Sequence, residues 1–396
     1  MPYVTVGREN SAAIRIYYED HGSGSPVVLV HGYALNGHSW EKQEAALLAA
    51  GHRVITYDRR GGGASSRPST GYDFGTLATD LHLLLSRLDL HGAVLAGFAM
   101  GTGEVARHLA EHGSERVRAA VLIAPLLPFL LKTSDNPDGI DRSVLDDIAA
   151  RIAADRPAAM KDFMDRSYNV DLLDGSRVSD QAWQNSFYVA ISASAHAALR
   201  CVTACLEDFR GDLAAISIPV LVIHGDQDRL LPYEATSRLL PALLTNARSI
   251  IIADGPHAII WTHADEVNRA LLDFIGGLGR LFRRATRHRV LGRRERTRRV
   301  ERAYLTGSGL GRLRREPQRV RINAVRVNCQ HLPIKFLRRG RFLVEPVEVA
   351  DVLAGFTDGA RVVVLPVALV SGDDGMRTEP FDDVECREPL LASLRV

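Results

Sequence analysis

The sequence lacks the features of several protein classes. It has four cysteines in 396 residues, and Cys201 and Cys205 stand one helical turn apart, which favours reduced thiols over a disulfide framework. Residues 1–10 contain no charged-then-apolar leader, and no apolar run is as long as a membrane span, so we expect a cytoplasmic protein without a membrane partner. No His or Cys spacing suits a metal ion, and residues 61–63 are not followed by the Gly-Lys-Ser/Thr of a phosphate-binding loop. The expected site therefore uses no cofactor.

Positive charge is concentrated in the last part of the chain. Residues 1–279 hold 24 Lys+Arg against 33 Asp+Glu, whereas residues 280–396 hold 25 against 14. Of those 25 basic residues only Lys335 is lysine. Because 46% of the residues are hydrophobic and the length exceeds one ordinary domain, we expect a globular domain over residues 1–277 and an arginine-rich extension over residues 278–396.

The arginine-rich extension has three interpretations. An out-of-frame reading of a GC-rich gene, which we favour, would give arginine in excess and almost no lysine. A real small domain would use the strand-like segments 320–327 and 361–370, with further structure over 342–353. Nucleic-acid binding is not expected, because aromatic residues for base stacking are sparse there and no nucleic-acid motif is present.

Short apolar runs alternate with segments of helical spacing. Strands are predicted at 26–30, 53–57, 93–97, 117–123 and 249–252, and helices at 76–90 and 100–111. This alternation predicts an α/β fold with a mostly parallel sheet covered by helices on both faces. Residues from about 125 to 211, including the apolar run Leu126–Leu131, have a helical pattern and predict a cap inserted into that fold.

A strand-to-helix junction carries an alanine where a nucleophile would stand. Residues Gly97 to Gly101 have the pattern G-x-A-x-G, and the G-x-S-x-G form of this turn lifts a serine above the edge of the sheet. Ala99 has only a methyl group and cannot attack a substrate. We expect Thr102 to pack under the turn rather than to replace the missing hydroxyl. Backbone N–H groups of the loop at Tyr33 and of Met100 are the expected oxyanion hole.

A base and an acid follow in the chain order of a catalytic triad. A buried strand beginning near Ile218 runs into an acidic loop, where Asp228 is the expected acid and Asp226 the alternative. The last strand leads to His257, the expected base. A carboxylate beside the imidazole would fix its tautomer and stabilise the imidazolium.

Three aromatic residues are candidates for an apolar substrate pocket. Phe129 and Trp183 belong to the predicted cap, and Trp261 follows His257. Most aromatic residues at helical spacing pack in the core, so we expect at least one of the three to line the pocket.

Several long stretches of residues 1 to about 276 resemble one known family. These stretches include Tyr17–Gly22, Leu35–Trp40, Ile55–Gly61, Met100–Arg107 and Trp261–His263. Through them the chain resembles the cofactor-free (non-heme) haloperoxidase, perhydrolase and esterase family of α/β-hydrolases. The resemblance implies the α/β-hydrolase fold and a metal-free Ser-His-Asp site that hydrolyses small or aryl esters and forms peracids.

The chain departs from this family's pattern at four positions besides Ala99. Ala34 stands where these enzymes typically have a proline in the oxyanion loop, Gly62 replaces an aromatic residue, Ala64 a glutamine and Gly75 an acidic residue. Several losses together favour a natural substitution at Ala99 over a deliberate replacement of the nucleophile.

The expected function follows from this combination. Serine-dependent acyl transfer is predicted to be largely lost, because removal of a triad nucleophile lowers turnover by roughly a million-fold. The alternatives are a non-catalytic protein that binds a small ligand, and catalysis that uses only the His257–Asp228 pair as a base. The expected partner is a small apolar or aryl ester or acid, and the oligomeric state, including a homo-oligomer, is left open.

Overall fold

The computed structural model describes residues 2–137, 139–278, 335–337 and 341–343. The chain divides into two units, Met1–Gly309 and Leu310–Val396. In the second unit the described residues form strands β9 (Lys335–Leu337) and β10 (Arg341–Leu343), which pair antiparallel. The strands expected at 320–327 and 361–370 lie outside the described residues, as do residues 280–326.

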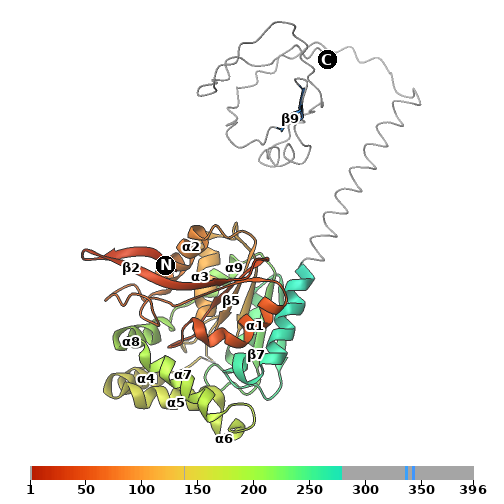
Figure 1. Cartoon of the computed structure of the whole chain (residues 1–396). Helices are drawn as coiled ribbons and strands as arrows, with labels where there is room; N and C mark the ends of the chain where they lie inside the picture. Colours follow the sequence, from red (N-terminus) through yellow and green to blue (C-terminus); the bar gives the residue numbers. More distant parts are fainter. Residues whose placement is uncertain (1, 138, 279–334, 338–340, 344–396) are drawn as a thin grey trace, which may run out of the picture. The chain divides into compact units, whose positions relative to one another are not determined.

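The first unit is built on an eight-stranded sheet (Figure 1). Its strands lie in the order β1-β2-β4-β3-β5-β6-β7-β8, and every pair from β4 to β8 is parallel. The prediction of a mostly parallel α/β sheet is confirmed, and an antiparallel ribbon, β1 with β2, extends one edge. The strands are β1 (Tyr3–Glu9), β2 (Ala12–His21), β3 (Pro26–Val30), β4 (Arg53–Tyr57), β5 (Ala93–Phe98), β6 (Val117–Ile123), β7 (Val220–Gly225) and β8 (Ala247–Ile252).

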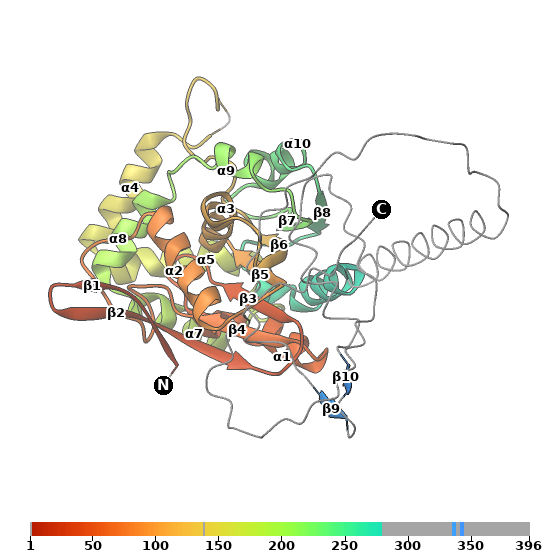
Figure 2. The same cartoon turned by 90° about the horizontal axis from the view of Figure 1, so that it is seen from above.

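Helices cover both faces of this sheet (Figure 2). One apolar core lies under α2 (Phe74–Arg87) and α3 (Met100–His112), and a second lies under α1 (Glu41–Ala49) and the helical residues 264–278. The central strands are apolar on both sides because both of their faces are buried. Shorter helices are η1 (Gly37–Trp40), α9 (Arg210–Ala214), η2 (Tyr233–Ala235), η3 (Ser237–Leu239), α10 (Leu240–Leu243) and α11 (Ile259–Thr262).

A helical cap is inserted between β6 and β7, and Figure 1 shows its helices gathered on one side of the sheet. Residues 126–131, expected to be helical, are irregular instead, because Pro125 and Pro128 break helical hydrogen bonding there. The cap helices are α4 (Arg142–Ala154), α5 (Arg156–Tyr168), α6 (Val170–Leu173), α7 (Asp180–Ser192) and α8 (Ala195–Ala204).

No helix among the described residues has the length and apolar character needed to span a membrane.

Candidate active site

The turn between β5 and α3 holds Ala99 in a backbone conformation that non-glycine residues rarely adopt. Its φ is 48° and its ψ is −116°, a region that costs about 1–3 kcal/mol and persists only where neighbouring structure enforces it. The Ala99 N–H donates to the carbonyl of Ile123 over 2.9 Å. A Cβ on Gly97 would lie 2.6 Å from the carbonyl oxygen of Gly101, so this crowded turn requires glycine at position 97. The sharp turn therefore persists although its central residue has no hydroxyl.

The side chain of Thr102 supports this turn from below. It is fully buried, and its Oγ1 donates to the carbonyl of Ala99 over 2.6 Å. The N–H of Leu126 donates to the same hydroxyl over 3.3 Å. Both hydrogen-bonding roles of Thr102 are therefore used inside the turn, and the expected packing under the turn is what the structure has.

His257 and Asp228 are in direct contact. His257 follows β8, Asp228 follows β7, and Nδ1 of the imidazole lies 2.8 Å from Oδ2 of the carboxylate. Both side chains are buried, whereas Asp226 is exposed. Because a carboxylate only accepts, Nδ1–H is the donor, and Nε2 is the nitrogen left to take up a proton.

Asp228 is held as a carboxylate by four hydrogen bonds. Its Oδ1 accepts from the N–H groups of Leu230 and Leu231, at 2.9 and 2.8 Å. Its Oδ2 accepts from His257 and, at 3.0 Å, from Nε2 of His224. Burial alone would raise the pKa of Asp228, but the electrostatic attraction of His257 and the hydrogen bonds from both imidazoles outweigh it and hold the pKa well below its usual range.

The base lies next to the turn that carries Ala99. The ring of His257 packs against Phe98, the residue before Ala99, with 5.1 Å between ring centroids. The backbone of Gly32 also adjoins this turn, since an added Cβ there would lie 3.3 Å from the methyl carbon of Ala99. The structure thus brings the base, the nucleophile position and the loop at Tyr33 together.

The N–H groups of Tyr33 and Met100 have no protein acceptor within the described part of the chain. Both adjoin Ala99: Met100 follows it and opens α3, whereas Tyr33 follows Gly32. Such N–H groups beside a nucleophile position can bind an oxyanion.

A buried polar network fixes the loop that carries Tyr33. Arg59 donates its backbone N–H to Nε2 of His31 over 2.9 Å, and His31 Nδ1–H donates to the carbonyl of Gly32 over 2.8 Å. The Arg59 guanidinium donates to the carbonyl of His31 and pairs with Glu104 of α3 at 2.8 Å. Burial, reinforced by the charge of Arg59, lowers the pKa of His31 far below its ordinary value, so this imidazole is neutral.

A narrow cavity reaches His257. Trp261 lines this cavity, together with Phe98, Phe163 and Tyr168. Of the three candidates, of which at least one was expected here, Phe129 and Trp183 do not line this cavity. Phe129 packs under the Arg210 guanidinium, and Trp183 stacks on Phe187 along α7 and faces a separate groove. Sequence spacing predicts which residues share one face of a helix, but it does not predict which face of a cap helix packs toward the cavity.

Two hydrogen bonds join the cap to the loops of the base and the acid. The N–H of Ala258 donates to the carbonyl of Ser167 over 2.8 Å, and the side chain of Asn169 donates to the carbonyl of Gln227 over 2.9 Å. Ser167 and Asn169 lie at the end of α5. The cap therefore helps to place His257 and Asp228 as well as to line the cavity.

Sequence reasoning missed His224, the second imidazole on Asp228. The sequence does contain a pattern that indicates this contact. A histidine near the end of a buried strand, four residues before the acid, lies within reach of the loop that carries the acid. Among the described residues, no group of three or more His, Cys, Asp or Glu side chains is arranged to hold a metal ion.

The arrangement can move a proton and stabilise negative charge. An imidazole that donates Nδ1–H to a buried carboxylate can accept a proton at Nε2, and two free N–H groups can hold an oxyanion. Ala99 has no side-chain oxygen to which an acyl group could be attached.

Comparisons with known proteins agree with this geometry. The family model described as the alpha/beta hydrolase fold matches residues 25–264. A putative non-heme chloroperoxidase of Synechocystis is 59% identical over 69% of this chain and 100% of its own length. A non-heme chloroperoxidase of Kitasatospora aureofaciens is 37% identical over 66% of this chain and 96% of its own.

Among solved structures, a bromoperoxidase from Bacillus anthracis superposes with a TM-score of 0.66 at 41% identity, over 69% of this chain and 99% of the other. Fold, sequence and site order all lead to the same assignment. The chain belongs to the α/β-hydrolase fold family, among the non-heme chloroperoxidases and haloperoxidases.

Proposed function

We propose that this protein is an esterase- or perhydrolase-type hydrolase in which serine-dependent acyl transfer is disabled at Ala99, while the groups that would serve a serine remain assembled. The observation that carries the proposal is the backbone of Ala99, which keeps the strained φ of 48° of a nucleophile turn. The His257–Asp228 contact beside it supports the same conclusion.

The proposed chemistry of a restored serine is ordinary acyl transfer. The serine oxygen would attack the ester carbonyl as Nε2 of His257 takes its proton, and the N–H groups of Tyr33 and Met100 would hold the carbonyl oxygen as it becomes negative. His257 would then return the proton to the departing alcohol or phenol. Water would release the acyl group in the second half of the cycle.

The substrate class in this proposal is a small apolar or aryl ester or acid. Trp261, Phe163 and Phe98 offer aromatic surfaces to such a group next to His257. A cytoplasmic location is part of the same proposal and is supported by the free thiols of Cys201 and Cys205.

Hydrolysis of p-nitrophenyl acetate by the native chain and by Ala99→Ser tests the proposal. We expect Ala99→Ser to raise kcat by at least about 1000-fold, since nucleophile removal from a working triad costs about a million-fold. The control Ala99→Ser/His257→Gln should lose the gain, because a serine without its base is a weak nucleophile. A folded Ala99→Ser protein with no more turnover than the native chain would refute the proposal.

Ligand binding without turnover is the second candidate, favoured by the apolar cavity beside a position that has no nucleophile. Phenyl acetate would then raise the melting temperature of the native chain and be recovered unchanged. The base-only alternative requires turnover of some substrate by the native chain that His257→Ala abolishes. If His257→Ala leaves every observed turnover unchanged, this alternative fails.

A further inference from the structure

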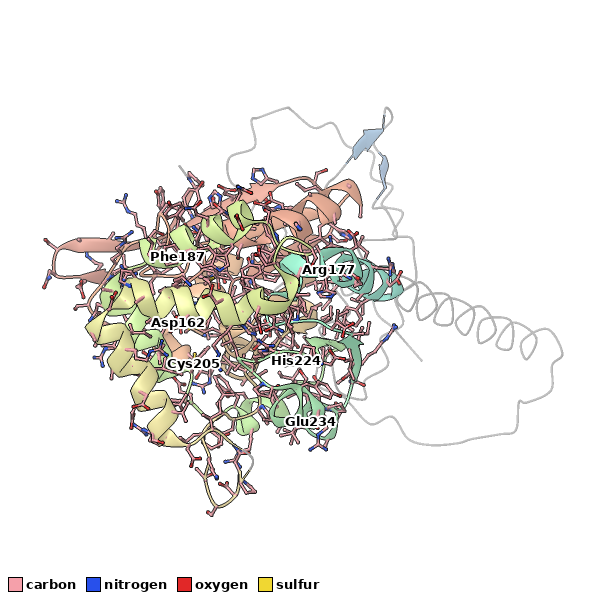
Figure 3. All side chains as sticks on the ribbon, turned by 90° about the horizontal axis from the view of Figure 1, so that it is seen from below. Asp162, Arg177, Phe187, Cys205, His224 and Glu234 are labelled. Atoms are coloured by element: carbon pink, nitrogen blue, oxygen red, sulfur yellow. The ribbon has the colours of Figure 1, made fainter. Side chains whose placement is uncertain are left out.

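His224 makes a second hydrogen bond to the carboxylate oxygen that His257 uses. It lies near the end of β7, is fully buried, and places Nε2 3.0 Å from Oδ2 of Asp228 (His224 is labelled in Figure 3). The His257 contact with the same oxygen is 2.8 Å long. One carboxylate oxygen is therefore shared between two imidazoles.

The hydrogen-bonding pattern fixes the tautomer of His224. Oδ2 of Asp228 can only accept, so Nε2 of His224 carries the proton that it donates. Nδ1 then accepts from the hydroxyl of Ser237, whose Oγ lies 2.6 Å away in η3. Ser237 is itself buried, so the chain Ser237–His224–Asp228–His257 is continuous and shielded from solvent.

We propose that His224 is a positioning residue that lowers the basicity of Asp228 and so sets the pH at which His257 becomes a free base. Its catalytic consequence rests on the proposed function, whereas its effect on the titration of His257 does not. A charge-assisted hydrogen bond draws negative charge from the acceptor, so two donors on one oxygen each bind more weakly than one donor would. With the His224 donor removed, the imidazolium of His257 would be stabilised more strongly.

Few other ionisable groups contact this chain of hydrogen bonds in the described structure. Tyr233 from η2 packs edge-on against the ring of His224 with 5.9 Å between centroids, and Phe98 from β5 covers His257. The N–H groups of Leu230 and Leu231 occupy the other oxygen of Asp228. Asp228 is thus the charged group through which the two imidazoles act on each other.

NMR titration of the His257 imidazole in the native full-length chain, assigned with His257→Gln, tests this inference without any need for turnover. His224→Phe keeps an aromatic ring of similar size but removes the donor, and we expect it to raise the pKa of His257 by roughly one unit. His224→Gln can still donate at the position of Nε2 and should leave the pKa within a few tenths of a unit of the native value.

Ser237→Ala provides an independent measurement if His224→Phe does not fold. Loss of the Ser237 hydroxyl releases the tautomer of His224, so the pKa of His257 should rise in the same direction by a smaller amount. An unchanged pKa in a folded His224→Phe protein, or in Ser237→Ala where His224→Phe does not fold, overturns the inference. A fall in melting temperature without a change in that pKa also overturns it, since this would mean that His224 only packs.

The catalytic consequence is measured separately in the Ala99→Ser background. There the acid limb of the kcat/KM profile should move to higher pH with His224→Phe by the same amount as the NMR pKa. If Ala99→Ser is inactive, the proposed function fails. The inference about His224 is then still tested by the NMR titration, which does not depend on turnover.

Discussion

The hydroxyl of Thr102 donates to the carbonyl oxygen of Ala99 over 2.6 Å, so the hydroxyl nearest in sequence to the nucleophile position holds the turn and is not free to attack. Because that bond is fully buried, Thr102→Val should destabilise the native chain by about 1–2 kcal/mol. Denaturant unfolding measures this cost. Thr79→Val removes a comparable bond to the carbonyl of Gly75 on the exposed surface of α2 and should cost less than Thr102→Val. A Thr102→Val protein as stable as the native chain would show that the turn does not need this bond.

The strain at Ala99 can be measured with two glycine substitutions. Ala99→Gly removes a methyl group but also relieves the φ of 48°, whereas Ala96→Gly removes an equally buried methyl from the regular strand β5. We expect Ala99→Gly to cost about 1–3 kcal/mol less than Ala96→Gly in free energy of unfolding. Equal costs for the two variants would mean that the turn at Ala99 stores no strain.

The positive φ of Ala34 favours glycine and disfavours proline at this position of the oxyanion loop. Its φ is 57°, and proline is locked near −65°, so this loop cannot hold the proline typical of the family without moving. Ala34→Gly should stabilise the fold by up to about 1 kcal/mol, and Ala34→Pro should destabilise it by about 3 kcal/mol. Urea unfolding of both variants is the measurement. A stabilising Ala34→Pro would show that the loop readily adopts a second conformation.

Stability should fall below about pH 6.5 because buried imidazoles must be protonated on unfolding. Burial, aided by His112 and His82, lowers the pKa of His108 to about 3, and both of its ring nitrogens lack hydrogen-bond partners in the described region. The unfolded chain therefore binds a proton that the folded chain rejects. The contribution of His108 to the free energy of unfolding is complete above pH 6.5 and decreases toward pH 3 by about 1.4 kcal/mol per pH unit.

The matched variants for this effect are His108→Leu and His91→Leu. His108→Leu removes the buried imidazole. When the pH falls from 7 to 5, its free energy of unfolding should decrease by about 2 kcal/mol less than that of the native chain. His91 is largely exposed, so His91→Leu should follow the native pH dependence closely. Unfolding free energies at pH 7 and pH 5 give the comparison. Identical pH dependence in His108→Leu and the native chain would contradict the assignment of acid sensitivity to His108.

Much of the fold could be predicted from local pattern. The apolar runs that became β3, β4, β5 and β6 are buried on both faces of a parallel sheet, and such strands must be apolar throughout their length. The ribbon of β1 and β2 was not predicted, because it lies at a sheet edge where its residues alternate between core and solvent. The run of residues 126–131 has the apolar character of a buried helix, but Pro125 before it and Pro128 within it prevent helical hydrogen bonding.

The sequence by itself determined the chemistry that the site can contain. Ala99 has no side-chain oxygen in any fold, and His257 and Asp228 are the right residue types in the right chain order. Tertiary structure decided which groups meet. Asp228 rather than Asp226 reaches His257, His224 joins the same carboxylate oxygen, and Trp261 rather than Trp183 lines the cavity. These contacts depend on sheet register and on the packing of the cap, which arise between segments far apart in the chain and leave no local pattern.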